Sequence, residues 1–504
     1  MRKQFRLPLT GSLASRVSAV NAADSTSGYV GIGIVGLMIV GKPSQPTDKD
    51  QRFLNCFTQT TADGKKYRVK RSGFSTLNTP ASGQKGYAII VWTGSGTGTD
   101  VITAFGETNS TIYNGTVSLG AITGRCTGLS ETFVTTTPTI CATSTDSTGW
   151  YYDSGVGVMT KIADADFPGN AGYTLAGTFV HLDGYAIIAT TDGKLWASDL
   201  NSVTPWTATS FDSANAYPDR GVAAVRHRDT VILFGSDSMQ VFQNAGRTPF
   251  PLVKVDSLTA RVGAVSMDAI TQISDVTFWA GSTPQGGLSI FQFDGAINRI
   301  STPEVDALLV LAGASNVTLS AIRTFGRSFV LVSAASETYA YCIEEKEWGP
   351  WSTTTPLWYK TCGVSMGSSM LTYSVSNKTT SGKVYTQNPG SMVFTDDGVA
   401  YTARMQLTPT DFGTMNKKFW KEVTVVGDVE TSASALTLAC SDDNYQSFTT
   451  LATLDLSEQR PRATRLGASR RRAWAYRLSI SRAGSTCPSP DTNCSTARCA
   501  AVRS

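Results

Sequence analysis

The sequence carries little charge and almost no histidine. Of its 504 residues 16% are charged, and only His181 and His227 are histidines. The HExxH, GxSxG, P-loop and paired CxxC motifs are all missing, so a hydrolase, nucleotide or metal site has few candidate residues. The net charge of +4 is small for this length and does not by itself indicate a nucleic-acid-binding surface. We therefore predict a protein that is not an enzyme, with no catalytic residues, no metal and no cofactor.

Cysteine pairs at metal-binding spacing are also missing. The first six of the nine cysteines are scattered along the chain, and the other three lie near its end. They occupy positions 56, 126, 141, 342, 362, 440, 487, 494 and 499. An odd number without a motif favours free, mostly buried thiols made in a reducing cytosol.

Long apolar runs and helix signals are scarce. Residues 29–40 (YVGIGIVGLMIV) are apolar, but about 12 residues are too few to cross a bilayer as a helix, and we expect a buried strand or hairpin there. The one credible helix covers residues 302–314. Thr302 could cap it, Pro303 would take its first position, and Glu304 and Asp306 would lie in its first turn.

What the sequence does contain is a repeat. A short apolar run is followed, roughly 11 to 23 residues later, by an aromatic-centred strand that ends in Asp, Asn or Gly, and this pair occurs seven times. The apolar runs start at residues 88, 131, 185, 230, 276, 328 and 369. This spacing is typical of four-stranded propeller blades, which must stack because one blade cannot bury both of its faces. We expect residues 88–92, 185–190, 230–235 and 328–333 to be inner strands.

The pattern changes on either side of the repeats. We predict an N-terminal arm with a small β segment (1–80), a β-propeller of about seven blades (81–395), a β-sandwich-like C-terminal platform module (396–485) and a flexible tail (486–504). Strict alternation of apolar and polar residues within 401–407, 421–426, 435–440 and 474–480 supports the sandwich. The fold class is therefore all-β.

A propeller with few histidines could still cleave glycosides through paired carboxylates. Asp183, Asp192 and Asp199 fall in one blade, but Asp183 and Asp192 each precede a glycine, which is typical of a hairpin turn. Residues 441–448 (SDDNYQSF) loosely resemble the Asp-box of sialidases, with Tyr445 where the box has glycine, and such a box is a structural turn. A carbohydrate-binding or glycoside-hydrolysing propeller is the alternative function.

Basic residues crowd the C-terminal module. We expect Phe419 to face the sandwich core and Trp420 to face outward, inside a rim of Lys417, Lys418 and Lys421, as in a protein interface. The arginines that we expect to meet a neighbouring subunit, an adaptor or the channel are Arg470, Arg471, Arg472 and Arg477. Replacing the first three by Ala should leave a folded monomer but impair ring or virion assembly. A solvated charged surface is the plainer interpretation.

Several stretches in the same order resemble one family. Residues 51–57 (QRFLNCF) and 71–74 (RSGF) are similar to the N-terminal pattern R-x-x-N-x-Y/F … P-G-F/I of the packaged-DNA stabilisation, or tail accessory, proteins of short-tailed bacteriophages. Residues 234–242 resemble their blade strand pair and residues 286–303 resemble a stretch further along. Residues 465–467 through 477–480 resemble their closing arginine-rich strand. The long N-terminal arm and the cysteine-containing tail depart from the family.

The resemblance implies a structural virion protein of a short phage tail, assembled in the host cytoplasm. It would form a homohexameric hub or nozzle whose channel retains packaged DNA and conducts it during ejection. The implied partners are an adaptor ring of the head–tail connector, a needle or plug protein, tail fibres or spikes, and double-stranded DNA passing without sequence specificity.

Overall fold

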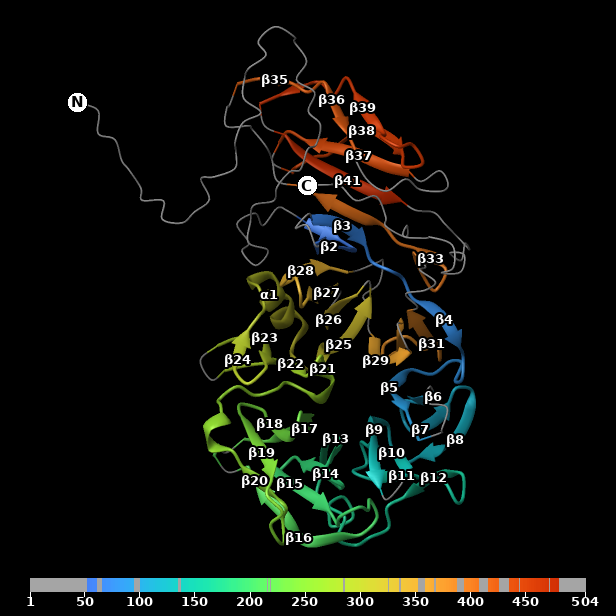
Figure 1. Ribbon diagram of the computed structural model, residues 1–504, viewed down its shortest axis with the longest axis vertical. Coiled ribbons are helices and arrows are strands. Elements are labelled where there is room, and N and C mark those ends of the chain that lie inside the picture. Colours follow the sequence, from blue (N-terminus) through green and yellow to red (C-terminus); the bar gives the residue numbers. More distant parts are fainter. Residues whose placement is uncertain are drawn as a thin grey trace, which may run out of the picture.

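The computed structural model describes most of residues 52–479. Its gaps are residues 61–65, 95–99, 135–136, 215, 218, 284–285, 325, 335–336, 352–358, 367–368, 388–393, 408–415, 426–434, 444 and 471. The apolar run 29–40 and the tail 486–504 lie outside the described residues. The regular structure of the described chain is almost entirely β-strand, as the all-β prediction expects (Figure 1).

Four-stranded antiparallel sheets form the larger part of the molecule. Blade 1 contains β5 (Gly86–Trp92), β6 (Asp100–Phe105), β7 (Ser110–Asn114) and β8 (Val117–Ile122). Blade 2 contains β9 (Cys126–Val134), β10 (Thr137–Ser144), β11 (Gly149–Asp153) and β12 (Val158–Lys161). Blade 3 contains β13 (Leu175–Leu182), β14 (Tyr185–Thr190), β15 (Lys194–Ser198) and β16 (Trp206–Ser213).

Four more sheets follow the same plan. Blade 4 contains β17 (Gly221–His227), β18 (Thr230–Gly235), β19 (Met239–Asn244) and β20 (Leu252–Lys254). Blade 5 contains β21 (Ile270–Ile273), β22 (Val276–Gly281), β23 (Ser289–Phe293) and β24 (Ile297–Arg299). Blade 6 contains β25 (Val317–Thr324), β26 (Arg327–Ala334), β27 (Glu337–Cys342) and β28 (Glu347–Pro350). Blade 7 contains β29 (Tyr359–Met366), β30 (Ser369–Ser376), β31 (Val384–Gln387) and β4 (Ser75–Asn78).

The blades stack into a closed ring. One apolar cluster lies between each pair of neighbours, including Ile112 of blade 1 with Ile140 of blade 2, and Val375 of blade 7 with Ile89 of blade 1. Every blade therefore buries both faces, as an isolated four-stranded sheet could not. The seven-bladed propeller predicted by the repeat is confirmed.

The predicted position of the repeat within each blade is partly wrong. Residues 88–92 belong to the first strand β5, which lies nearest the centre, but residues 185–190, 230–235 and 328–333 are the second strands β14, β18 and β26 (Figure 1). A second strand is flanked by two strands and covered on both faces, so it is the most continuously apolar run. First strands such as β13 and β25 contain Thr, Ser and His, which weakens their signal.

The ring is closed by a strand from the N-terminal segment. β4 pairs with β31, with Asn78 opposite Val384 and Ser75 opposite Thr386, and becomes the outer strand of blade 7. The same segment supplies the hairpin β2 (Cys56–Thr60)–β3 (Lys66–Lys70) and the short strand β1 (Arg52–Leu54). Residues 52–78 are thus shared between the propeller and the C-terminal module.

The C-terminal module is a two-layered β-structure above blades 6 and 7 (Figure 1). One layer has the strand order β1, β34 (Ala403–Gln406), β41 (Ala473–Ser479), β37 (Ala435–Ser441) and β38 (Thr449–Asp455). The other layer consists of β35 (Lys418–Phe419) with β40 (Ala468–Ser469), and β36 (Glu422–Thr424) with β39 (Arg462–Thr464). Met405, Val423, Leu438 and Tyr476 are buried between the layers, as expected of a sandwich. The hairpin β32 (Thr395–Asp396)–β33 (Val399–Ala400) leads into it.

Helix α1 (Pro303–Ala312) lies where the sequence predicts a helix. Thr302 has the extended backbone of an N-cap and Pro303 starts the helix, although the Thr302 side chain makes no capping hydrogen bond. Val305, Leu308 and Leu309 pack into the cluster between blades 5 and 6. The described residues also contain the short 3-10 turns η1 (Asp256–Leu258), η2 (Met267–Ala269) and η3 (Ala314–Asn316).

We predict that Gly73→Ala destabilises the protein by about 1–3 kcal/mol, a cost typical of overpacking a buried site. A Cβ at Gly73 would lie 2.0 Å from the backbone oxygen of Thr395, so the segment between β3 and β4 would have to move away from the start of β32. Urea unfolding measures the loss. Gly349→Ala is the matched control, because the nearest atom to its new Cβ would be 3.4 Å away. Equal midpoints for the two variants would contradict the prediction.

Candidate functional site

A buried arginine joins the N-terminal segment to the start of the C-terminal module. Arg71 is fully buried, its Nε donates to Asn55 Oδ1 at 2.9 Å, and its two terminal nitrogens bind both carboxylate oxygens of Asp396. Asn55 in turn donates to the carbonyl of Thr402 at 2.8 Å. The forked guanidinium suits this bidentate pairing, which lysine could not reproduce.

Aromatic rings cover the same joint. The guanidinium of Arg71 lies 3.9 Å from the ring centre of Tyr401, whose hydroxyl donates to the Arg71 carbonyl. The buried ammonium of Lys70 lies 4.3 Å from the centre of the Tyr401 ring and 5.4 Å from that of Phe394. Two cations are therefore desolvated against π faces and a carboxylate, an arrangement that fixes the module tightly on the propeller.

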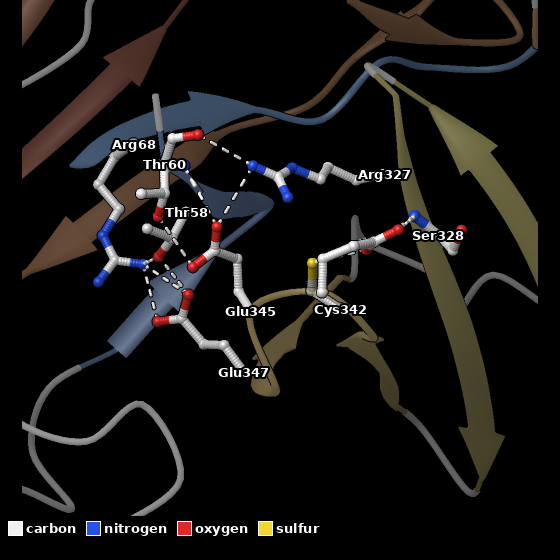
Figure 2. A network of polar contacts seen from close by, with 9 residues as sticks. Thr58, Thr60, Arg68, Arg327, Ser328, Cys342, Glu345 and Glu347 are labelled. Atoms are coloured by element: carbon white, nitrogen blue, oxygen red, sulfur yellow. Dashed lines mark hydrogen bonds and ion pairs between the residues drawn. The ribbon is translucent and has the colours of Figure 1, made fainter. Parts of the chain in front are cut away.

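A second polar network ties the β2–β3 hairpin to blade 6 (Figure 2). Arg68 pairs with Glu347 at 2.7 Å, and Thr58 donates to the same carboxylate. Glu345 accepts from the hydroxyl of Thr60 at 3.0 Å and lies 3.4 Å from Arg327. The turn of blade 6 is thus bonded to the hairpin through both acidic and basic side chains.

These contacts explain the N-terminal stretches that resemble the phage family. Asn55, Arg71 and Gly73, all within residues 51–57 and 71–74, form the joint itself. Sequence reasoning singled out residues 71–74 but missed Asp396, Glu345 and Glu347. Their partners in the N-terminal segment lie 279 to 325 residues away along the chain, and no local pattern signals such a pairing.

The predicted interface residues are divided between surface and core. Lys417, Lys421, Arg470 and Arg477 are exposed, while Lys418 is partly buried and its ammonium donates to the Arg470 carbonyl at 2.8 Å. Arg471 lies outside the described residues. We call Lys417, Phe419, Lys421 and Arg470 the basic knob. Phe419 stands within it, 84% exposed.

The expected orientation of Phe419 and Trp420 is wrong. Trp420 is 3% exposed in the sandwich core, where its Nε1 donates to Ser469 Oγ at 2.8 Å. The prediction extended the alternation of Val423 and Val425 back to residue 419. However, β35 ends at Phe419 and β36 begins at Glu422, so the two intervening residues break the register. Phe419, and not Trp420, is the aromatic side chain available to a partner.

Arg472 is likewise a core residue. It is 4% exposed, pairs with Asp442 through two bonds of 2.7 Å, and lies 5.5 Å from the Trp420 ring centre. It also donates to the Leu466 carbonyl at 2.5 Å. Removing its guanidinium would leave Leu466 and Asp442 without their partner, so the triple replacement of residues 470–472 is a poor test of assembly.

The residues considered for catalysis have local structural roles. Asp183 has a left-handed φ of 48° and accepts from Asn244, Asp192 pairs with Lys194, and Asp199 accepts from Thr207. His227 is buried with its Nδ1 3.1 Å from Thr277 Oγ1, and burial beside Arg228 lowers its pKa. In the described part of the chain no group of three or more His, Cys, Asp or Glu side chains could hold a metal ion.

His181 and His227 are the last or nearly the last residues of first strands in neighbouring blades. Arg226 donates from its guanidinium to the His181 carbonyl at 3.4 Å. Burial, with Arg226 nearby, lowers the pKa of His181. The two histidines therefore lie at the same end of neighbouring blades, and each is partly or fully buried there.

The Asp-box-like turn connects β37 and β38. Asp443 accepts from the Ser441 and Ser447 hydroxyls and from the Ser447 amide, and Tyr445 has the φ of 69° that suits glycine. The Ser447 hydrogen bonds lower the pKa of Asp443 to about 2. The structure thus places these residues in a local turn, as the sequence predicts.

Among the described residues, no helix is long and apolar enough to cross a membrane. The free cysteines there are Cys56, Cys126, Cys141, Cys342, Cys362 and Cys440. Burial raises the pKa of Cys141 to about 12, so this thiol stays protonated and unreactive at neutral pH.

A seven-bladed β-propeller carrying a β-sandwich module is the class that these features define. Residues 111–360, which run from the third strand of blade 1 into the first strand of blade 7, match the family model described as bacteriophage P22 Gp10, β-propeller. The chain belongs to this phage family and is a bacteriophage structural protein. No curated protein matches it closely enough to count as a relative.

Breaking the joint should destabilise the whole chain. We expect Arg71→Met to lower the free energy of unfolding by about 3–5 kcal/mol, because Asp396 would lose its partner in a mostly buried site. Denaturant unfolding followed by tryptophan fluorescence measures the change. Lys85→Met is the control, since the Lys85–Glu107 pair is exposed and should change little. A loss no larger than that of the control would show that the joint contributes nothing to stability.

The Asp443 turn should be sensitive to acid. Because the folded pKa is about 2, the ionised carboxylate stabilises the folded state above its ordinary pKa near 4, and this contribution disappears as the pH falls toward 2. Asp443→Asn keeps an acceptor oxygen but cannot ionise. The difference in urea midpoint between the parent protein and this variant should narrow from pH 6 to pH 2. A constant difference would contradict the assignment.

Proposed function

We propose that this chain forms a ring-shaped hub or nozzle of a short phage tail, whose channel retains packaged DNA and conducts it during ejection. The observation that carries the proposal is the family match over residues 111–360, which falls on the blades themselves. The colinear stretches at both ends of the chain extend the likeness to the joint and the module. The ring would be a homohexamer, assembled in the host cytoplasm and located in the virion tail.

The rigid joint supports a mechanical role. The Arg71–Asp396 pair and the network around Glu345 and Glu347 fix the module to the propeller on two sides of the N-terminal segment. A load applied to either part is therefore transmitted to the other, which suits a protein that holds DNA under pressure. The partners in this proposal are an adaptor ring of the head–tail connector, a needle or plug protein, and tail fibres or spikes.

The basic knob supports the ring contact. Its aromatic side chain is 84% exposed and has the exposed Lys417 and Lys421 close by in the chain, the composition of an interface with an apolar centre and a charged rim. Passing double-stranded DNA would meet cationic groups through its phosphates, without sequence specificity and with strong salt dependence.

Electron microscopy of purified phage particles tests the proposal. A ring of this chain below the portal, enclosing a channel wide enough for a DNA duplex, is the expected result. Finding the chain only as a free monomer in infected cells, and not in particles, would refute the proposed function.

The basic knob also offers a matched pair of variants. We expect Phe419→Ser combined with Arg470→Ser to fold with an unchanged melting temperature but to associate about thirtyfold more weakly, since an interfacial aromatic contributes about 2 kcal/mol or more. Analytical ultracentrifugation and particle yield measure this loss.

Arg472→Ala is the contrasting variant, because it should affect the stability of the fold and not the association of subunits directly. It should lower stability by about 3 kcal/mol, the low end for a broken buried pair, because Asp442 is 42% exposed. Normal particle yield from the Phe419–Arg470 double variant would show that the basic knob plays no part in assembly.

A further inference from the structure

The outer turns of blades 1 to 3 expose aliphatic side chains. Val117 is 65% exposed after the turn between β7 and β8, Val156 is 68% and Val158 is 41% exposed at the next turn, and Leu200 is 57% exposed between β15 and β16. We call these four residues the distal rim. Single exposed aliphatics are common, but turns normally carry polar residues and glycine, so their occurrence in three successive blades is unusual.

The distal rim runs along one edge of the propeller. Each blade is an up-and-down meander that begins at the centre, so the turns between third and fourth strands all lie on the same face. Strands β8 and β12 touch, since a Cβ added at Gly120 would lie 3.9 Å from the Cβ of Val158. Blades 2 and 3 lie at the end of the molecule opposite the C-terminal module (Figure 1).

The equivalent turns of the next three blades differ. Blade 4 exposes Arg247 and buries Phe250, and blade 5 has Asp294 and Gly295. The turn of blade 6 carries Glu345, which is bonded to the β2–β3 hairpin. The aliphatic rim is therefore a local feature of blades 1 to 3 and does not follow from propeller geometry.

Charge is distributed in the same uneven way. Residues 86–213, which make up blades 1 to 3, contain eleven Asp or Glu and only three Lys or Arg. Asp153 and Asp199 lie at the ends of the turns that carry Val156 and Leu200, and Lys194 is already paired with Asp192. Such a surface repels DNA phosphates and attracts cationic groups.

We propose that the distal rim docks a second virion protein whose contact surface is apolar at its centre and bordered by Lys and Arg. This inference rests on the proposed function. Apolar contact at Val156 and Leu200 supplies affinity, and the surrounding carboxylates select a basic partner and orient it. The acidic blades then face away from the DNA.

The test measures whether the distal rim is covered in particles. Val156→Cys is labelled with a maleimide in the isolated protein, in intact virions and in virions emptied of DNA. Arg247→Cys, in the equivalent turn of blade 4, is the matched control, and the parent protein gives the background. We expect residue 156 to react about tenfold or more slowly in both kinds of particle, as for a face covered by a stable complex, and residue 247 to react equally in all samples.

Each other outcome overturns the docking proposal in a distinct way. Equal labelling of residue 156 everywhere shows an uncovered rim. Slow labelling already in the isolated protein shows that a second copy covers it, and slow labelling only in filled particles shows that DNA does. If the chain is absent from particles, the proposed function fails first and this proposal fails with it.

A separate variant tests whether the partner is basic. Asp153→Asn and Asp199→Asn keep the oxygens that accept from the Gly155 amide and the Thr207 hydroxyl, so both turns are preserved while two negative charges are lost. Combined with Val156→Cys, this pair should increase labelling in virions severalfold and make it less sensitive to salt, because the charge attraction that salt screens has been removed. If this variant is labelled at the same rate as Val156→Cys alone, at both low and high salt, a basic partner is ruled out.

Discussion

The pairing of Arg71 with Asp396 is the contact on which the rest of the molecule depends. Arg71 precedes β4, the strand that closes the propeller, and Asp396 follows β31, its partner strand in blade 7, so one buried pair clamps both ends of the ring. The same pair lies where the chain leaves for the C-terminal module. Burying two charges is costly unless their geometry is good. The hydrogen bond that Arg71 donates to Asn55 and its contact with the Tyr401 ring are therefore part of the same requirement.

The propeller and the C-terminal module, which this pair joins, bury their apolar surfaces in different ways. The propeller repeats one sheet and hides its faces by stacking, which demands apolar residues on both sides of the second strands. The module uses two unlike layers and hides one face of each. Its inner positions include Trp420 and Arg472, so part of its core is a hydrogen-bonded aromatic and a paired cation. The propeller is also acidic in its first three blades, whereas the exposed residues near Phe419 are basic.

The sequence was sufficient to predict the architecture, but not the pairings between residues far apart in the chain. Spacing alone predicts seven blades, and alternation predicts β34, β37 and β41, because both signals arise from local burial. It could not reveal that β4 completes blade 7, since that pairing joins residues 311 positions apart. The orientation of Trp420 was missed because two irregular residues shift the register between β35 and β36. Arg472 looked like a surface charge because its partner, Asp442, lies 30 residues away.

The shared closing strand has a consequence for synthesis on the ribosome. Residues 75–78 emerge early, but their pairing partner in β31 emerges only after about three hundred more residues have been translated. Until then the nascent ring is a stack of blades with an uncovered apolar face at each end. The β4 segment also lacks its partner strand, and such free strand edges invite pairing with other chains. Premature termination within blade 7 would leave this exposure permanent. A host chaperone that shields strand edges would therefore matter more for this chain than for a protein closed by adjacent strands.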